Sequence, residues 1–322
     1  GSAVGAALEN KAAADFSNLP NPQTALYNLG ARTERNLLDN PDFAIWQRYP
    51  NGEFTGVPNG MYIADRFIIT NSNGEMESKL VRVDGGGIKN LSGPPCVIMQ
   101  RLENAAQYNG KMLTRSFLYE LNGAQRLVSY TSIAADWTDT TDVLRVGENQ
   151  AWIMEGETLR AVKLELGPVQ TLARQNAEGT WELIDPPPNP ALELAKCQRY
   201  LQVLLYGGYD EAYSGIGGIS GTDNKPRIQV PFQLKQPMRT NPTLITGCMQ
   251  VNRARIVERS LSTYLPDRGT SVKAMTLYIS TKNQIIVMCE LPDTVTLAEN
   301  YTYELDALSC PRGEVLLASA EL

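Results

Sequence analysis

Short runs of alternating apolar and polar residues dominate the chain, and they predict strands rather than helices. The clearest runs in the first half are MESKLVRV (76–83), CVIMQRLE (96–103), LTRSFLYEL (113–121), RLVSYTSI (126–133) and LRAVKLELG (159–167). Turn sequences such as NSNG, DGGG and LNG separate these runs. Strands at this spacing, with no helices between them, predict an antiparallel β-sandwich of about eight strands, arranged like a jelly roll.

The pattern resumes after a proline-rich boundary, DPPPNP (185–190). Its three consecutive prolines favour a stiff, extended linker. The run ALELAKCQRY that follows predicts a short helix with Asn189 as its N-cap and Pro190 at the first helical position. RIQVPFQL, AMTLYIS, QIIVMCEL and YTYELDAL then predict a second domain built from strands, and the glycine-rich run 206–221 predicts a long loop within it.

The first 35 residues differ from the rest of the chain. Apolar residues recur there at helical spacing, at Leu8, Ala12, Phe16 and Leu19, but the stripe is too thin to bury itself in a single chain. Neighbouring copies of the chain would supply the missing partners, so we expect a stalk; the alternative is an arm without fixed packing. The predicted organisation is a trimeric stalk segment at 1–35, a carbohydrate-binding-like β-sandwich at 36–185, a linker and short helix at 186–198, and a C-terminal β-sandwich tip domain at 199–322.

Composition narrows the classes of partner. The chain has 322 residues, of which 43% are hydrophobic and 20% are charged, and this balance is typical of a globular protein. Its net charge of -6 and the absence of a Lys/Arg run argue against nucleic-acid binding, because neutralising phosphates supplies most of that affinity. No apolar stretch approaches the ~20 residues that cross a bilayer, so no membrane insertion is expected.

Two residue types constrain the chemistry. The five cysteines are far apart in the sequence, which argues against a zinc site or a disulfide framework and favours folding in a reducing cytoplasm. Histidine is absent, which excludes Ser-His-Asp and Cys-His catalysis and the usual zinc ligand sets. Any enzyme of this sequence would have to use carboxylates, Tyr or Lys. We expect no metal, no cofactor and no enzymatic activity.

Four parts of the chain carry motifs in a characteristic order. They are LENKAAADFSNLPNPQTALYNLGA (8–31), NLLDNPDFAIWQR (36–48) with YIADRF (62–67), VKLELGPVQTLA (162–173), and LELAKCQRYLQ (192–202) with FQLKQPMRTNPTL (232–244). In this order they resemble the distal part of tailed-bacteriophage tail fibres of the receptor-binding kind. The second part is similar to the family opening N-L-L-x-N-x-F-x-I-x-Q-R … x-D-R-W, although Phe67 stands where Trp is usual. Leu201 stands where a second Tyr is common, and the His-x-His iron motifs of some fibres are missing.

The resemblance implies a homotrimer on the virion tail. Such a protein would fold in the host cytoplasm, be held by more proximal tail-fibre or baseplate proteins, and attach the virion to a bacterial surface glycan or outer-surface protein. In this interpretation 36–48 marks the point where the stalk widens into a β-sandwich. The residues agree, because NPDF favours a turn, and Phe43, Ile45 and Trp46 are suited to anchor the first strand in a core.

One candidate binding residue lies in ADWTDTTD (135–142). An exposed Trp137 beside carboxylates would stack on a sugar ring, and the alternative is a Trp packed inside the sandwich. Asp136, Asp139 and Asp142 are spaced three residues apart and could ligate calcium, but the full calcium-loop pattern is absent and a solvated turn is the simpler interpretation.

The second candidate is the glycine-rich run 206–218. Tyrosine offers rigid contact area with a polar tip, and glycine lets the backbone approach a ligand. The alternative is a tip loop whose tyrosines pack between subunits. The candidate receptor-contacting residues of this run are Tyr206, Tyr209, Asp210 and Tyr213.

Two other classes of protein remain open. A polysaccharide depolymerase would need two acids at suitable spacing, and pairs such as Asp210 with Glu211 or Asp139 with Asp142 could be suggested. However, the chain lacks the repeats of a long parallel β-helix. The other class is a carbohydrate-binding adhesin of a secreted bacterial protein, against which the lack of a disulfide framework argues weakly.

Overall fold

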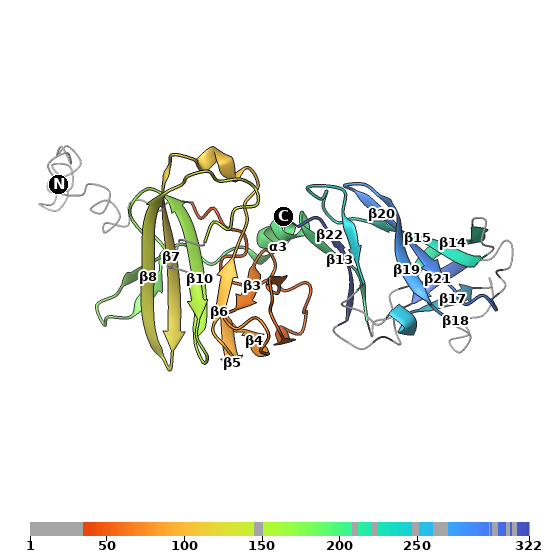
Figure 1. Cartoon of the computed structure of the whole chain (residues 1–322), viewed down its shortest axis with the longest axis horizontal. Helices are drawn as coiled ribbons and strands as arrows, with labels where there is room; N and C mark the ends of the chain where they lie inside the picture. Colours follow the sequence, from red (N-terminus) through yellow and green to blue (C-terminus); the bar gives the residue numbers. More distant parts are fainter. Residues whose placement is uncertain are drawn as a thin grey trace, which may run out of the picture.

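A computed structural model describes residues 35–144, 151–207, 212–220, 225–246, 251–259, 270–295, 297, 302–306, 310 and 314–321. The predicted stalk, apart from Arg35, lies outside these residues. The described chain is mainly β, with several antiparallel sheets and one α-helix. Figure 1 shows two strand-rich bodies with the helix α3 between them and the C-terminus beside it. We refer to them as the first and the second domain.

The larger sheet of the first domain has the strand order β1-β4-β5-β10-β7-β8. Its strands are β1 (Glu53–Gly56), β4 (Ser78–Arg82), β5 (Ile88–Ser92), β7 (Met112–Leu121), β8 (Ala124–Ile133) and β10 (Thr158–Leu166). β7 and β8 form a ten-pair hairpin from Met112↔Ile133 to Leu121↔Ala124. Asn122, at φ 51°, and Gly123, at φ 80°, make its turn, which is the left-handed geometry that a two-residue hairpin loop requires.

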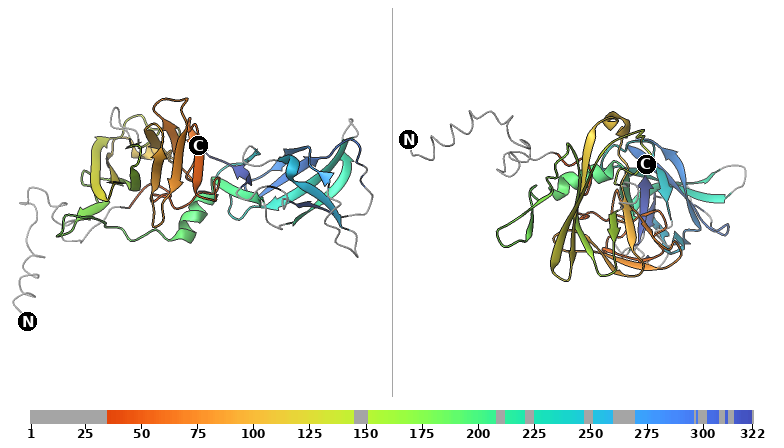
Figure 2. Two further views of the ribbon diagram at one scale, coloured as in Figure 1. Left: turned by 90° about the horizontal axis from the view of Figure 1, so that it is seen from below. Right: turned by 60° about the vertical axis from the view of Figure 1, so that its left-hand side comes forward.

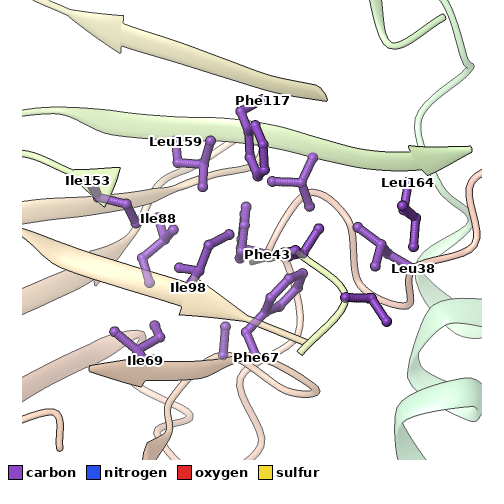
Figure 3. Packing of buried hydrophobic residues seen from close by; sticks show 14 of the residues in the cluster. Leu38, Phe43, Phe67, Ile69, Ile88, Ile98, Phe117, Ile153, Leu159 and Leu164 are labelled. Atoms are coloured by element: carbon purple, nitrogen blue, oxygen red, sulfur yellow. The ribbon is translucent and has the colours of Figure 1, made fainter. Parts of the chain in front are cut away.

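A smaller sheet lies opposite, with the order β2-β3-β6-β9. Its strands are β2 (Met61–Tyr62), β3 (Ile68–Asn71), β6 (Cys96–Met99) and β9 (Ala151–Ile153), and a 3-10 turn, η2 (Ala105–Tyr108), follows β6. Both sheets contribute to one core: Phe117 and Leu159 meet Ile69, Ile98 and Ile153 (Figure 3). Each such buried side chain contributes roughly 1.5–3 kcal/mol.

The run 36–52 forms turns rather than a strand, so the first strand begins later than the sequence predicts, at Glu53. The predicted turn at NPDF is present, because the Phe43 N–H donates to the Asn40 carbonyl at 3.0 Å. Phe43 and Trp46 are buried as expected, and the Phe43 ring lies 4.4 Å from that of Phe67. Phe67, which stands where the motif of the resemblance has Trp, is therefore a core residue.

A short hairpin, β11 (Ala173–Gln175) with β12 (Trp181–Leu183), covers the outer face of the larger sheet. This cover buries β10 on both faces, including the fully buried Lys163. The Lys163 ammonium lies 2.5 Å from a carboxylate oxygen of Asp185 and 3.8 Å from one of Glu165. The proline-rich linker is therefore tied to the first domain at its start, and Figure 2 shows this part of the chain running beside that domain to α3.

The helix α3 (Pro190–Gln198) confirms the prediction for the linker region. The Asn189 side chain accepts from the N–H groups of Ala191 and Leu192, and Pro190 occupies the first turn, where no N–H is needed. Nine residues make a marginal helix in isolation. Burial of Glu193, Cys197 and Gln198 at the junction of the two domains supplies the remaining stability.

The second domain contains a three-stranded sheet, β13-β22-β16, and a seven-stranded sheet, β18-β17-β21-β14-β15-β20-β19. Its strands are β13 (Leu201–Tyr206), β14 (Ala212–Ser220), β15 (Lys225–Gln233), β16 (Thr243–Ile245), β17 (Arg255–Arg259), β18 (Thr270–Ser271), β19 (Ala274–Ser280), β20 (Gln284–Glu290), β21 (Thr302–Asp306) and β22 (Val315–Ser319), with a 3-10 turn, η3 (Val251–Arg253). Residues of both sheets, such as Leu205, Val287 and Leu316, share one core.

Alternation of apolar and polar residues predicted the positions of many strands correctly, but not the strand in the glycine-rich run. Each of the nine quoted alternating runs overlaps a strand of the structure. The predicted long loop at 206–221 is wrong over most of its length, because β14 pairs with β15 and β21 there. Glycine contributes no side chain to the alternating pattern, so the glycine-rich run showed no alternation that would predict a strand. The pairing of two neighbouring strands outweighs the low strand propensity of glycine.

Candidate functional site

Trp137 lies at the edge of the first core rather than on the surface. Its side chain is 7% exposed, its ring stands edge-on to Tyr108 at 6.4 Å, and the Arg115 guanidinium lies 5.4 Å from the ring centre. The backbone is fixed by Asn109, whose side-chain oxygen accepts from the Trp137 N–H at 2.8 Å. This geometry is that of the packed alternative, and little ring surface is left for stacking on a sugar.

The three neighbouring aspartates do not converge on a metal site. Asp139 accepts from the Ala105 N–H at 3.2 Å, and Asp142 pairs with Arg101 at 3.1 Å, whereas Asp136 is an exposed residue in the left-handed region, at φ 54°. No group of three or more His, Cys, Asp or Glu residues suited to a metal occurs in the described part of the chain.

The tyrosine candidates lie in the second domain, so the structure does not bring Trp137 and Tyr206 to a single site. Tyr206 ends β13 half-buried, against a small cluster that includes Val203. Tyr213 lies on β14 opposite Leu305. Tyr209 and Asp210, as well as the side chain of Tyr213, lie outside the described residues.

The junction of the two domains carries a set of buried polar contacts that begins at Asn40. This fully buried residue adopts a left-handed conformation, at φ 54°. Its amide donates to the carbonyl oxygens of Ile45 and Asp65 at 3.0 Å each, which closes the turn. Its backbone N–H donates to the Glu193 carboxylate of α3 at 2.9 Å. One residue therefore shapes the turn and binds the helix.

Gln47 and Asp65 continue the junction. The Asp65 carboxylate accepts from the Gln47 backbone N–H at 2.8 Å and from the Gln47 side chain at 2.6 Å. The second amide hydrogen of Gln47 is donated to the carbonyl oxygen of Leu201, in the second domain, at 2.9 Å. Burial raises the pKa of Asp65 to about 7, and the Gln47 hydrogen bonds act in the opposite direction.

Two arginines complete the contact between the domains. Arg48 pairs through both terminal nitrogens with Glu321, near the C-terminus, and both side chains are less than 10% exposed. The Arg66 guanidinium lies 3.4 Å above the ring of Tyr200 and donates to the carbonyl oxygen of Arg101 at 2.6 Å. Arg66 also pairs with Asp39 at 3.3 Å.

A more exposed group of charges borders this buried set. Glu103, of the first domain, pairs with Arg199 at 2.9 Å and with Arg239 at 3.5 Å. Arg239 in turn donates its backbone N–H to the Arg199 carbonyl at 2.9 Å. Buried hydrogen bonds demand defined geometry, because an unpaired buried group costs about 1–3 kcal/mol. The junction is therefore suited to hold the two domains in one relative orientation.

A pocket of about 460 Å³ adjoins the junction on the side of the linker. Its buried apolar surface comes from Leu38, Ala161, Val162 and Leu172, and the linker forms one wall, at 183–188. Its polar lining residues are Arg35, Asn36, Asp42, Asp185, Glu193 and Lys196. The volume falls within the range of natural small-ligand sites, roughly 300–1,000 Å³.

Most charges in this pocket are already paired. Glu193 pairs with Lys196 at 2.5 Å, and Asp185 pairs with Lys163. Asp42 accepts from the Ala44 N–H at 3.3 Å and has no ion-pair partner among the described residues. Burial, as the largest cause, raises the pKa of the Asp42 carboxyl.

The sequence did not single out the pocket or the individual polar contacts of the junction. A signal for the junction was present, because Asn40, Gln47, Asp65 and Arg66 are polar positions of the motif that resembles tail fibres. Pocket residues such as Asn36, Val162 and Glu193 also lie in the tail-fibre-like parts, but the pocket itself was not predicted, because separate stretches of the chain form its lining.

Fold and site together define a class: an antiparallel β protein of two domains that are joined by a buried polar junction, beside which a pocket lies. Compared with known proteins, this chain matches no family model, no curated protein and no solved structure. Within the described residues, no helix has the length and apolar character needed to cross a membrane.

Proposed function

We propose that this protein is the distal, receptor-binding part of a bacteriophage tail fibre. It acts as a homotrimer on the virion tail, held by more proximal tail-fibre or baseplate proteins, and it binds a bacterial surface glycan or outer-surface protein without covalent chemistry. Both domains are proposed to be β-sandwiches, the first with a jelly-roll-like arrangement. The first 35 residues are proposed to form the trimeric stalk.

One observation carries this proposal: two of the tail-fibre-like parts of the sequence meet at one place. Gln47 of the 36–48 run and Asp65 of the 62–67 run share hydrogen bonds, and Gln47 also binds the carbonyl of Leu201 in the 192–202 run. Glu193 of the same later run accepts from Asn40. Motifs that are about 150 residues apart therefore contact each other at the domain junction. This contact supports the interpretation that their order in the sequence is characteristic of tail fibres and not accidental.

A junction that fixes the two domains relative to each other suits an attachment protein. A fibre tip must present its binding surfaces at fixed positions, because several weak sites gain affinity only when the geometry lets them bind together. Linked sites of this kind raise the overall affinity by roughly 10²–10⁴ without any new contact. A junction of hydrogen-bonded, buried side chains limits domain rotation more than a flexible linker would.

The mass in solution and binding to cells test the proposal together. Light scattering after gel filtration at micromolar concentration should give about three times the chain mass of 35.4 kDa. Fluorescently labelled protein should bind to the surface of at least one strain in a panel of bacteria with different surface glycans. A monomer that binds to no strain would contradict the proposal.

A reducing-sugar assay on the bound cells separates attachment from cleavage. We expect no release of new sugar ends. Release of such ends would instead favour a polysaccharide depolymerase.

A further inference from the structure

The pocket beside the junction has the layout of a binding site for a small polar ligand. Aliphatic side chains that include Val162 and Leu172 form a buried surface, and polar groups stand around it. It lies partly open, because Arg35 is exposed at its lining and Leu183 is 47% exposed. A ligand could therefore enter without separating the two domains.

Two lining residues of opposite charge, Asp42 and Arg35, can form hydrogen bonds with a ligand. Asp42 offers acceptor oxygens and Arg35 offers donors, and neither has an ion-pair partner in the part of the chain that the structure describes. The other acids, Asp185 and Glu193, are neutralised by lysines and keep further lone pairs for hydrogen bonds.

This combination favours one class of ligand over others. A phosphate or sulfate group would be attracted by Arg35 but repelled by the carboxylate of Asp42, so it would gain little net charge attraction in the pocket. A purely apolar ligand would cover the half-buried Asp42 carboxylate without offering it a hydrogen-bond donor, which costs free energy. A neutral polyhydroxylated ring fits both features, because its hydroxyls donate and accept while its C–H faces cover aliphatic surface.

We propose that the pocket binds one saccharide residue, with Asp42 accepting from its hydroxyl groups and Arg35 donating to them. This inference rests on the proposed function, since it assigns a position for glycan recognition within the attachment protein. The site is next to α3 and the linker, whereas the sequence pointed to Trp137 and to the tyrosine-rich run.

The site should be weak by itself. No aromatic ring is among the described residues that line the pocket, so the sugar gains no stacking energy there. We expect a dissociation constant on the order of 1 mM, and such a site would depend on several copies acting together.

The test uses saturation-transfer NMR with the full chain and a panel of free sugars: glucose, galactose, mannose, rhamnose and N-acetylglucosamine. At least one sugar should receive saturation from the wild-type protein. Asp42→Asn keeps the size and the turn-closing oxygen but removes the charge, and it should weaken binding of that sugar by at least fivefold. Leu183→Trp should block the pocket and abolish the signal.

The matched control is Leu192→Trp. This leucine is 64% exposed on α3 and does not line the pocket, so its replacement should leave the signal unchanged. The inference is overturned if no sugar in the panel receives saturation, or if Asp42→Asn and Leu183→Trp bind as the wild type does. If those variants lose the sugar signal but the trimer and cell binding persist, the pocket inference stands, and another surface also contacts the cell. If sugar binding is lost by neither variant while the trimer binds cells, only the pocket inference fails.

Discussion

Replacing Gln47 with alanine should weaken the junction more than any change at an exposed glutamine. The wild-type amide donates to a buried carboxylate at 2.6 Å and to the Leu201 carbonyl at 2.9 Å. A hydrogen bond to a charged group contributes about 1.5–3 kcal/mol and a neutral one about 1 kcal/mol. Both acceptors would lose a partner at a site where Gln47 is only 8% exposed. We therefore expect the free energy of unfolding to fall by about 3 kcal/mol.

Urea unfolding followed by tryptophan fluorescence measures this loss, at one fixed protein concentration because an oligomer is expected. With a slope of about 3 kcal/mol per molar urea, the midpoint should fall by roughly 1 M. Gln233→Ala is the control, since the exposed side chain of Gln233 donates to the Asn283 carbonyl within the second domain and makes no contact across the junction among the described residues. It should shift the midpoint by less than a third as much. Equal shifts for the two variants would refute the reasoning about the junction.

Three further changes test individual parts of the structure. Asp65→Asn removes a group whose folded pKa of about 7 exceeds the ordinary 3.8. Because the folded state holds the proton of Asp65 more tightly, wild-type stability should fall relative to this variant by about 3 kcal/mol between pH 4 and pH 7, and urea midpoints at several pH values measure this loss. Lys163→Met should cost about 3 kcal/mol, because it leaves the buried Glu165 without its neighbouring cation, and a thermal or urea midpoint near wild type would contradict this. Gly93→Ala places a methyl group 2.5 Å from a backbone oxygen at φ 106° and should destabilise by more than about 2 kcal/mol, whereas Gly110→Ala, which meets no atom within 4 Å, should cost about 1 kcal/mol.

The local features of the fold could be predicted because they depend on short-range chemistry. The helix at Pro190–Gln198 follows from its Asn cap and its first-turn proline, and the strand Met112–Leu121 follows from alternation. Strands such as β14 could not be predicted, because the glycines there provide no pattern and pairing with distant strands decides the conformation. The double burial of β10 also depends on a hairpin formed by residues that come after it.

The junction and the pocket were harder to predict from the sequence than the fold. Trp137 carries the residue type that binds sugars, but its burial is set by Tyr108 and Arg115, which are remote in sequence. Asp42 gave no signal as a ligand-binding residue, because its importance arises only where the linker and α3 close a pocket around it. The motif 36–48 suggested a boundary between segments, and the structure adds that its polar residues bind across the domains.

A distance measurement between the domains tests the central claim most directly. Spin labels at Lys111→Cys and Lys282→Cys would occupy exposed positions on the first and second domains, in a Cys248→Ala background where the remaining four cysteines are buried. Labelled chains diluted with an excess of unlabelled chains report the distance within one molecule. The account predicts a single narrow distance distribution that broadens in Gln47→Ala. A broad or multiple distribution in the otherwise unchanged protein would contradict a junction that fixes the two domains.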